Sequence, residues 1–248
     1  MARVVAFGDI HIGNINADLI SFKELLRRAM SYSPDYVVLI GDVIDAMFKY
    51  RTQIFKNISF RPIDVQRIMF RKIIEPILRG RTKLVVIRGN HDVNFIEDFL
   101  EPALKDLKIP YEYRPYYILD STLYIHFIHR RASGSYATAI TPMLLHYALT
   151  YAKAYQVRRV VFGHIHRPAA QVTVEGYNIV ALPSFLMRGD ATDEFNPRCF
   201  ALIEKDSCSF ICDDRPKTYN YLAQVQIHNL IMMNEALIEI IRTQGPLL

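Results

Sequence analysis

Residues 36–45 read Tyr-Val-Val-Leu-Ile-Gly-Asp-Val-Ile-Asp, an apolar run that ends in a glycine and then carries two carboxylates. A short, continuous apolar run is typical of a strand that is buried on both faces of a sheet. Apolar runs with polar endings of the same kind occur at 3–11, 83–92 and 158–166. Because ligands bind at the carboxyl ends of strands in α/β sheets, we expect these endings to meet at one edge of the fold.

The segments between these runs have apolar residues at helical spacing. Residues 17–31 follow this pattern, and a second helix is expected from Pro62 to about Leu78. Alternation of strands and helices over the first two thirds favours parallel strands with crossover helices, whereas the last third indicates short antiparallel strands. Further helices are expected at 94–107 and 142–155, and further strands at 113–119, 122–129, 170–174, 178–182, 199–204 and 207–212.

The composition describes an ordinary globular protein that favours anionic partners. Of the 248 residues, 51% are hydrophobic and 22% are charged, and the net charge is +5. A mild basic excess fits substrates such as nucleic acids and nucleotides. No run approaches the roughly 18 apolar residues of a membrane span, so we expect no membrane span. The chain enters an apolar strand directly after Met1-Ala2-Arg3, without a secretory signal, and we expect a cytoplasmic protein.

The cysteines allow two interpretations. Three cysteines, Cys199, Cys208 and Cys212, are an odd and low count, which favours a reducing compartment and free thiols. If Lys205-Asp206 forms a two-residue hairpin loop, however, Cys199 faces Cys212 on the neighbouring strand. A cross-strand disulfide is therefore the alternative.

The last part of the chain predicts a long amphipathic helix from about Tyr219 to Ile241. We accordingly expect a domain over residues 1–216 and a helical tail over 217–248. The tail either packs on its own domain, which we favour, or forms a homo-oligomer contact. Its seam has the four-three spacing of a coiled coil with one polar member and consists of Ala223, Ile227, Leu230, Asn234, Leu237 and Ile241.

Five fragments carry residues that bind metals. Carboxylate, imidazole and amide oxygen together suit Mn²⁺, Fe or Zn²⁺. In an extended segment, residues two apart point the same way, so two ligands in one fragment can converge. A single fragment of this kind is usually structural, but five in order at strand ends indicate a site. They are Asp9-Ile10-His11, Gly41-Asp42-Val43-Ile44-Asp45, Gly89-Asn90-His91-Asp92, His129 and Gly163-His164-Ile165-His166.

In this order the fragments resemble the signature of the calcineurin-like metallophosphoesterases, DxH, GDxxD, GNH, H and GHxH, over residues 9–166. The resemblance implies an α/β fold, a sandwich of two mixed β-sheets flanked by helices (αββα), to which the tail adds a long helix. It also implies two divalent metal ions at one edge of the sandwich. We expect Mn²⁺, with Fe or Zn²⁺ as alternatives.

The resemblance also implies a role for each residue. One metal would be held by Asp9, His11 and His166, the other by Asn90, His129 and His164, with Asp42 as the bridge, His91 as the catalytic histidine and Asp45 as its orienting partner. One position departs from the pattern, because Arg130 follows His129 where the family commonly has glycine. His126 is therefore a rival ligand. We prefer His129 because it lies at the expected end of its strand, and His126 would face the opposite side.

The expected function is a metal-dependent phosphodiesterase that acts on nucleic acid or nucleotides. Two metals would supply hydroxide for attack on phosphorus, and His91 would protonate the leaving oxygen. A phosphomonoesterase or nucleotide-sugar pyrophosphatase is the alternative, and a non-catalytic scaffold is the remote one. Residues 46–63 combine basic and aromatic side chains without an acid, which suits a nucleic-acid contact, although the aromatics could instead fill the loop's own core. The candidate substrate contacts are Lys49, Arg51, Arg130, Arg131 and Arg167.

Overall fold

The structure is a computed structural model. It describes residues 2–46, 63–78, 80–93, 98–126, 140–166, 168–187, 197–213, 215 and 219–244. The first sheet has the strand order β11 (Cys208–Asp213), β10 (Arg198–Ile203), β1 (Val4–Gly8), β2 (Tyr36–Ile40), β3 (Lys83–Ile87) and β4 (Tyr111–Arg114). The second has the order β5 (Tyr116–Leu119), β6 (Thr122–Ile125), β7 (Arg159–Phe162), β9 (Tyr177–Ala181) and β8 (Ala170–Val174). The helices are α1 (Leu19–Met30), α2 (Ile63–Ile74), α3 (Glu101–Lys105), α4 (Pro142–Ala154) and α5 (Tyr219–Gln244).

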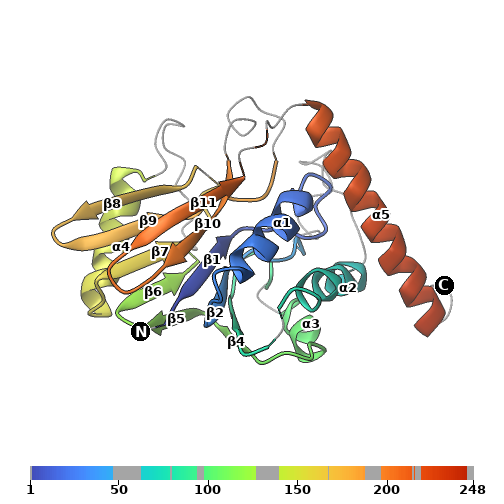
Figure 1. Ribbon diagram of the computed structural model, residues 1–248, viewed down its shortest axis with the longest axis horizontal. Helices are drawn as coiled ribbons and strands as arrows, with labels where there is room; N and C mark the ends of the chain where they lie inside the picture. The colour runs from blue at the N-terminus through green and yellow to red at the C-terminus, as the bar shows by residue number, and fades with distance from the viewer. Residues whose placement is uncertain are drawn as a thin grey trace.

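The two faces of each central strand of the first sheet pack into two different hydrophobic cores. Val37 and Leu39 of β2 face the helices α1, α2, α3 and α5, whereas Val38 and Ile40 face the second sheet. This alternation follows from the period of two in a strand. Helix α4 covers the other face of the second sheet, so the layers run helix, sheet, sheet, helix (Figure 1). The expected αββα sandwich of two mixed sheets is therefore confirmed.

The carboxyl ends of the central strands coincide. In the parallel pairs β1–β2 and β2–β3, Gly8 lies beside Ile40, and Ile40 lies beside Ile87. In the second sheet, Ile125 of β6 likewise lies beside Phe162 of β7. The segments that follow these five residues consequently leave from one edge of the sandwich.

The single strand expected at 113–119 is wrong. The structure has two strands there, and they belong to different sheets: β4 pairs with β3, and β5 pairs with β6. Pro115 separates them. Proline has no backbone N–H to donate to a ladder, so the strand ends and the chain crosses to the other sheet.

The long helix expected at 94–107 is also wrong within the described part of that range. Only Glu101–Lys105 is helical. The carboxylate of Asp98 accepts hydrogen bonds from the backbone N–H groups of Leu100 and Glu101, at 3.2 and 3.0 Å, and from Tyr113. These local side-chain bonds form a turn at residues 98–100, and the helix begins after it.

Helix α5 packs on its own domain through a different stripe from the expected seam. The exposed fractions of Ile227 and Leu230 are 59% and 36%, and Ala223 and Asn234 are also exposed. The polar residue inside the contact is Asn229, not Asn234. The buried stripe consists of Tyr221, Val225, Asn229, Met232, Met233, Ala236 and Ile240.

The hairpin of β10 and β11 has the register that a two-residue loop predicts. The backbone N–H of Glu204 donates to the carbonyl of Ser207 at 3.1 Å, and Cys199 is the partner of Cys212. A disulfide joins these two cysteines, with a Cα–Cα distance of 4.0 Å. The disulfide, given above as the alternative to free thiols, is thus what the structure contains.

Among the described residues, no helix combines the length and the apolar character needed to cross a membrane.

Candidate metal centre

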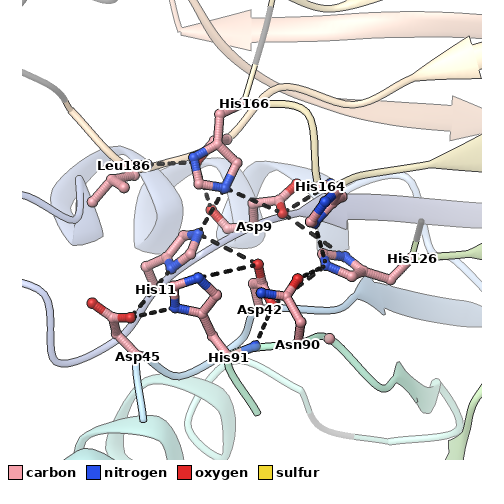
Figure 2. A network of polar contacts seen from close by, with 12 residues as sticks. Asp9, His11, Asp42, Asp45, Asn90, His91, His126, His164, His166 and Leu186 are labelled. Carbon is pink, nitrogen blue, oxygen red and sulfur yellow. Dashed lines mark hydrogen bonds and ion pairs between the residues drawn. The ribbon is translucent and has the colours of Figure 1, made fainter. Parts of the chain in front are cut away.

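The site lies where the segments after β1, β2, β3, β6 and β7 come together (Figure 2). Five of its residues have left-handed backbone conformations, with φ between 33° and 76°. Such angles are unfavourable for residues other than glycine, and they concentrate at functional sites. Ligand residues two apart in the sequence were expected to converge because they lie in extended segments. In the structure they converge because the backbone turns at these residues. The five are Asp9, His11, Asp42, His164 and His166.

Glycine is needed next to the site because the loops touch. A Cβ added at Gly89 would collide with the backbone nitrogen of Asp42, and one added at Gly41 would collide with the ring of His126. The loops after β2 and β3 can approach each other this closely only with glycine at position 89, and His126, which follows β6, can lie against the loop after β2 only with glycine at position 41.

The first group of ligand atoms contains Asp9, His11, Asp42 and His166. The Nε2 atoms of His11 and His166 lie 3.0 Å apart. His166 Nε2 is 3.6 Å from Asp9 Oδ1, and His11 Nε2 is 3.9 Å from Asp42 Oδ2. One ligand atom from each residue lies within 4.8 Å of all the others, which is the spacing of a metal site.

The second group shares Asp42 with the first. Nε2 of His126 lies 3.4 Å from Asp42 Oδ1, 3.1 Å from Asn90 Oδ1 and 3.2 Å from His164 Nδ1. Asp42 thus faces the first group with Oδ2 and the second with Oδ1, and Figure 2 shows its carboxylate between the two sets of rings.

His126, the rival of His129 as a ligand, lies in the second group. Strand β6 ends at Ile125, so His126 is the first residue after the strand and is free of the alternation that would turn it away. Its Nδ1 lies 3.1 Å from the carbonyl of Ile40, which fixes the ring and leaves Nε2 to face the site. Ligating histidines characteristically donate their second ring nitrogen in this way. His129 lies outside the described residues.

A third contact orients His91. Its Nδ1 lies 2.5 Å from Asp45 Oδ1, and its Nε2 points toward Asp42 at 4.0 Å. Burial alone would raise the pKa of Asp45, but hydrogen bonding to His11 and His91 holds the pKa of this carboxyl well below its usual range. Asp45 therefore stays ionised and keeps the proton of His91 on Nδ1.

Asp92 organises the same loops, and the sequence analysis gave it no role. Its fully buried carboxylate accepts hydrogen bonds from the backbone N–H groups of Gly89, at 2.9 Å, and Ile44, at 3.0 Å. Burial and the neighbouring charge of Asp42 raise the pKa of Asp92 to about 7. The sequence signal for a role of Asp92 was its position directly after His91, within the fragment Gly89-Asn90-His91-Asp92.

The donor set fits divalent metals. Nitrogen and oxygen donors of the kind that bind Mn²⁺, Fe and Zn²⁺ converge in three groups among the described residues: the two above and a third formed by His11, Asp45 and His91. The cluster also attracts positive charge. Burial would lower the pKa of His126, yet the carboxylates of Asp42 and Asp9 raise it to about 9. The proton on His126 supplies the positive charge that the buried carboxylates of Asp42 and Asp9 need. A metal cation at the same place would be stabilised for the same reason.

The basic candidates for substrate contact lie outside the described residues. They are Lys49, Arg51, Arg130, Arg131 and Arg167.

Comparisons with known proteins give the class. The family model of the calcineurin-like phosphoesterases matches residues 2–168, which is more than half of the chain. The chain belongs to the calcineurin-like phosphoesterase family. Membership supports a hydrolase of phosphoester bonds, in agreement with the cluster of histidines and carboxylates that could hold metal. No curated protein matches the chain.

Several solved structures are similar. A hypothetical protein from Pyrococcus horikoshii OT3 has a TM-score of 0.53 at 12% identity, with 99% of each chain covered, and shows the same fold. Vps29 from Entamoeba histolytica, complexed with Zn²⁺, has a TM-score of 0.46 at 12% identity, covering 87% of this chain and 99% of that one. A conserved protein from Streptococcus pneumoniae TIGR4, described as a predicted phosphoesterase, has a TM-score of 0.40 at 12% identity, covering 85% and 89%.

Proposed function

We propose that the protein is a two-metal phosphodiesterase that acts on nucleic acid or nucleotides. The observation that carries the proposal is the carboxylate of Asp42, whose two oxygens face two separate groups of histidines. A single structural carboxylate would need one partner, whereas this arrangement suits a bridge between two cations. His91 and Asp45 lie beside it as a proton-transfer pair.

The two groups define the ligands. Asp9, His11 and His166 would hold one metal, and Asn90, His164 and a third histidine would hold the other. We propose His126 as this third histidine, with His129 as the alternative. Mn²⁺ is the proposed metal, and Fe and Zn²⁺ suit the same donors.

The chain's own residues would bind the phosphate and move a proton. Two bound divalent cations would lower the pKa of water and neutralise charge on the phosphoryl oxygens. His91 would donate its Nε2 proton to the departing oxygen, because Asp45 fixes the other ring proton on Nδ1. Nε2 of His91 lies 4.0 Å from Asp42 Oδ2, so a phosphate held at the two groups would be within its reach.

The positive charge of the chain is the reason for proposing a nucleic-acid substrate. The net charge of +5 and the basic, aromatic segment 46–63 suit a phosphate backbone with bases to stack. Arg130, Arg131 and Arg167 adjoin the ligand-bearing segments in the sequence and are proposed with Lys49 and Arg51 as phosphate contacts. A monoester or a nucleotide-sugar pyrophosphate on the same site remains the second proposal. The full set of ligand types speaks against a non-catalytic scaffold.

The test begins with protein that is stripped of metal and reloaded with Mn²⁺. Bis-nitrophenyl phosphate, nitrophenyl phosphate and a short single-stranded DNA are assayed, and bound metal is counted by mass spectrometry. Asp42→Asn is expected to lose both metal and activity, while Asp45→Asn keeps the metal and loses turnover. Cleavage of the monoester but not the diesters would contradict the phosphodiesterase. Two bound metals without turnover on any substrate would point to the pyrophosphatase or the scaffold.

Location and assembly are proposed separately. We propose the cytoplasm, although the disulfide of Cys199 and Cys212 would be unusual in a reducing compartment. We also propose that residues 217–248 act as a tail on the 1–216 domain, with the exposed side chains of Ile227 and Leu230 on α5 available to a second copy.

A further inference from the structure

Helix α5 holds the loop that follows the first ligand segment. The side-chain amide of Asn229 is fully buried, and its Nδ2 donates to the backbone carbonyls of Ile15 and Ala17, at 2.9 and 2.7 Å. The carbonyl of Asn14 lies 3.4 Å from the same nitrogen. One side chain of the last helix thus fixes the carbonyls of a loop 212 to 215 residues earlier in the chain.

The loop in turn holds Asp45. Asn14 is 3% exposed, and its Nδ2 donates to Asp45 Oδ2 at 2.9 Å. Its Oδ1 accepts the backbone N–H of Asn16 at 2.9 Å, so both ends of this amide are engaged. The backbone N–H of Asn14 also donates to the carbonyl of His11 at 3.0 Å. The amide is therefore locked in one orientation, with its donor aimed at the carboxylate.

Both carboxylate oxygens of Asp45 have side-chain partners, and Nδ1 of His11 also lies 3.9 Å from Oδ1. Oδ1 lies against His91 and Oδ2 against Asn14. Without Asn14, Oδ2 would be a buried carboxylate oxygen that has lost its hydrogen bond, and the carboxylate would be free to rotate away from His91. A displacement of about 1 Å in a catalytic group can cost about 100-fold in rate.

We propose that Asn14 is a positioning residue for the Asp45–His91 pair and that α5 supports it through Asn229. The inference rests on the proposed function of His91 as proton donor. The tail helix is then part of the support of the active site and not an appendage. The simpler reading is that Asn14 and Asn229 only stabilise their loop. The two readings differ in what happens to His91 when the protein remains folded.

The test compares leaving groups. With Mn²⁺ bound, a diester with a nitrophenyl leaving group depends little on the proton from His91, whereas one with an alkyl leaving group depends on it fully. Asn14→Ala is expected to lower kcat on the alkyl diester by roughly 10–100-fold, the usual range for loss of an outer partner, with a much smaller loss on the nitrophenyl diester. KM and bound metal stay unchanged. Asn229→Ala is expected to act in the same direction with a smaller loss.

Matched variants distinguish a loss of the positioning of Asp45 from a loss of folding. Asn14→Asp keeps the size and the acceptor for Asn16, but it replaces the donor to Asp45 with a second carboxylate. It should therefore show the same leaving-group pattern even if Asn14→Ala fails to fold. Gln226→Ala is the control on α5, because Gln226 bonds only the side chain of Asn16, at 2.9 Å, among the described contacts. It should leave the ratio of the two rates unchanged.

A second readout does not require activity. In metal-free protein, the downfield proton resonance of the His91 Nδ1–H that Asp45 accepts should be present in the wild type and in Gln226→Ala, and it should broaden or vanish in Asn14→Ala and Asn14→Asp. Equal losses on both diesters together with an unchanged resonance would overturn the inference. If the wild type is inactive on every substrate, the proposed function fails, and the resonance still decides whether Asn14 positions Asp45.

Discussion

The proton on His126 makes a quantitative prediction about metal binding. Asp42 and Asp9 raise the pKa of His126 to about 9, so at pH 7 the ring of the metal-free protein is protonated. A metal can bind Nε2 only after that proton leaves. Because pH 7 lies two units below about 9, the proton weakens the apparent affinity by roughly 100-fold, or about 2.7 kcal/mol. Raising the pH removes the competitor, and the affinity should rise about tenfold from pH 7 to pH 8.

The assay is a competition of metal-free protein with a chelator for Mn²⁺ at pH 7 and pH 8, at constant ionic strength. His126→Gln should bind more weakly and lose most of the pH dependence, while His129→Ala should keep it. A wild-type affinity that changes less than about twofold would refute the reasoning. If His129→Ala flattens the dependence instead, His129 is the ligand. The sign for folding is opposite: the raised pKa stabilises the metal-free fold below about pH 6.5, and this contribution is lost as the pH rises toward 9.

Three other outcomes follow from the structure. His91→Ala should keep both metals and lose roughly 10²–10⁴-fold in turnover on a poor leaving group, and normal turnover there would remove its assigned role. Phe22→Ala should lower the free energy of unfolding by about 3–5 kcal/mol in urea melts, because the ring is fully buried against Phe7 and Phe185; a loss below about 1 kcal/mol would contradict that packing. If a second copy covers the exposed side chains of Ile227 and Leu230 on α5, Ile227→Asp should reduce the mass in solution to that of a monomer, and an unchanged mass would exclude that interface.

The sequence predicted the structure best at the strands that end in metal-binding residue types. Continuous apolar runs predicted β2 and β3 to the residue, and the polar endings brought Asp9, Asp42 and Asn90 to one edge. The failures have local causes. Pro115 could be recognised as a strand breaker, but its effect, a transfer between sheets, depends on tertiary pairing. The choice of His129 over His126 depended on where β6 ends, which a sequence pattern places only to within a few residues; it stays a prediction, because His129 lies outside the described residues.

Asn14 and Asn229 show a different limit. Each is a single polar residue, and nothing in the sequence links positions 215 residues apart. The periodicity of α5 even drew attention to Asn234, which is exposed, because a regular seam is visible in a sequence and a buried amide is not. Only the packed structure places the amide of Asn229 against the carbonyls of its loop.

The pairing of β1 with β10 joins two segments that are made at very different times during synthesis. Val4 lies opposite Ile203, and the sheet is complete only when these distant segments meet. Synthesis proceeds from the N-terminus, so a nascent chain presents Asp9 and His11 long before β10 and α5 leave the ribosome. Closing so long a loop costs entropy before any contact repays it, which makes this step slow. The sheet that carries Asp9 and His11 is therefore completed only after β10 has been synthesised.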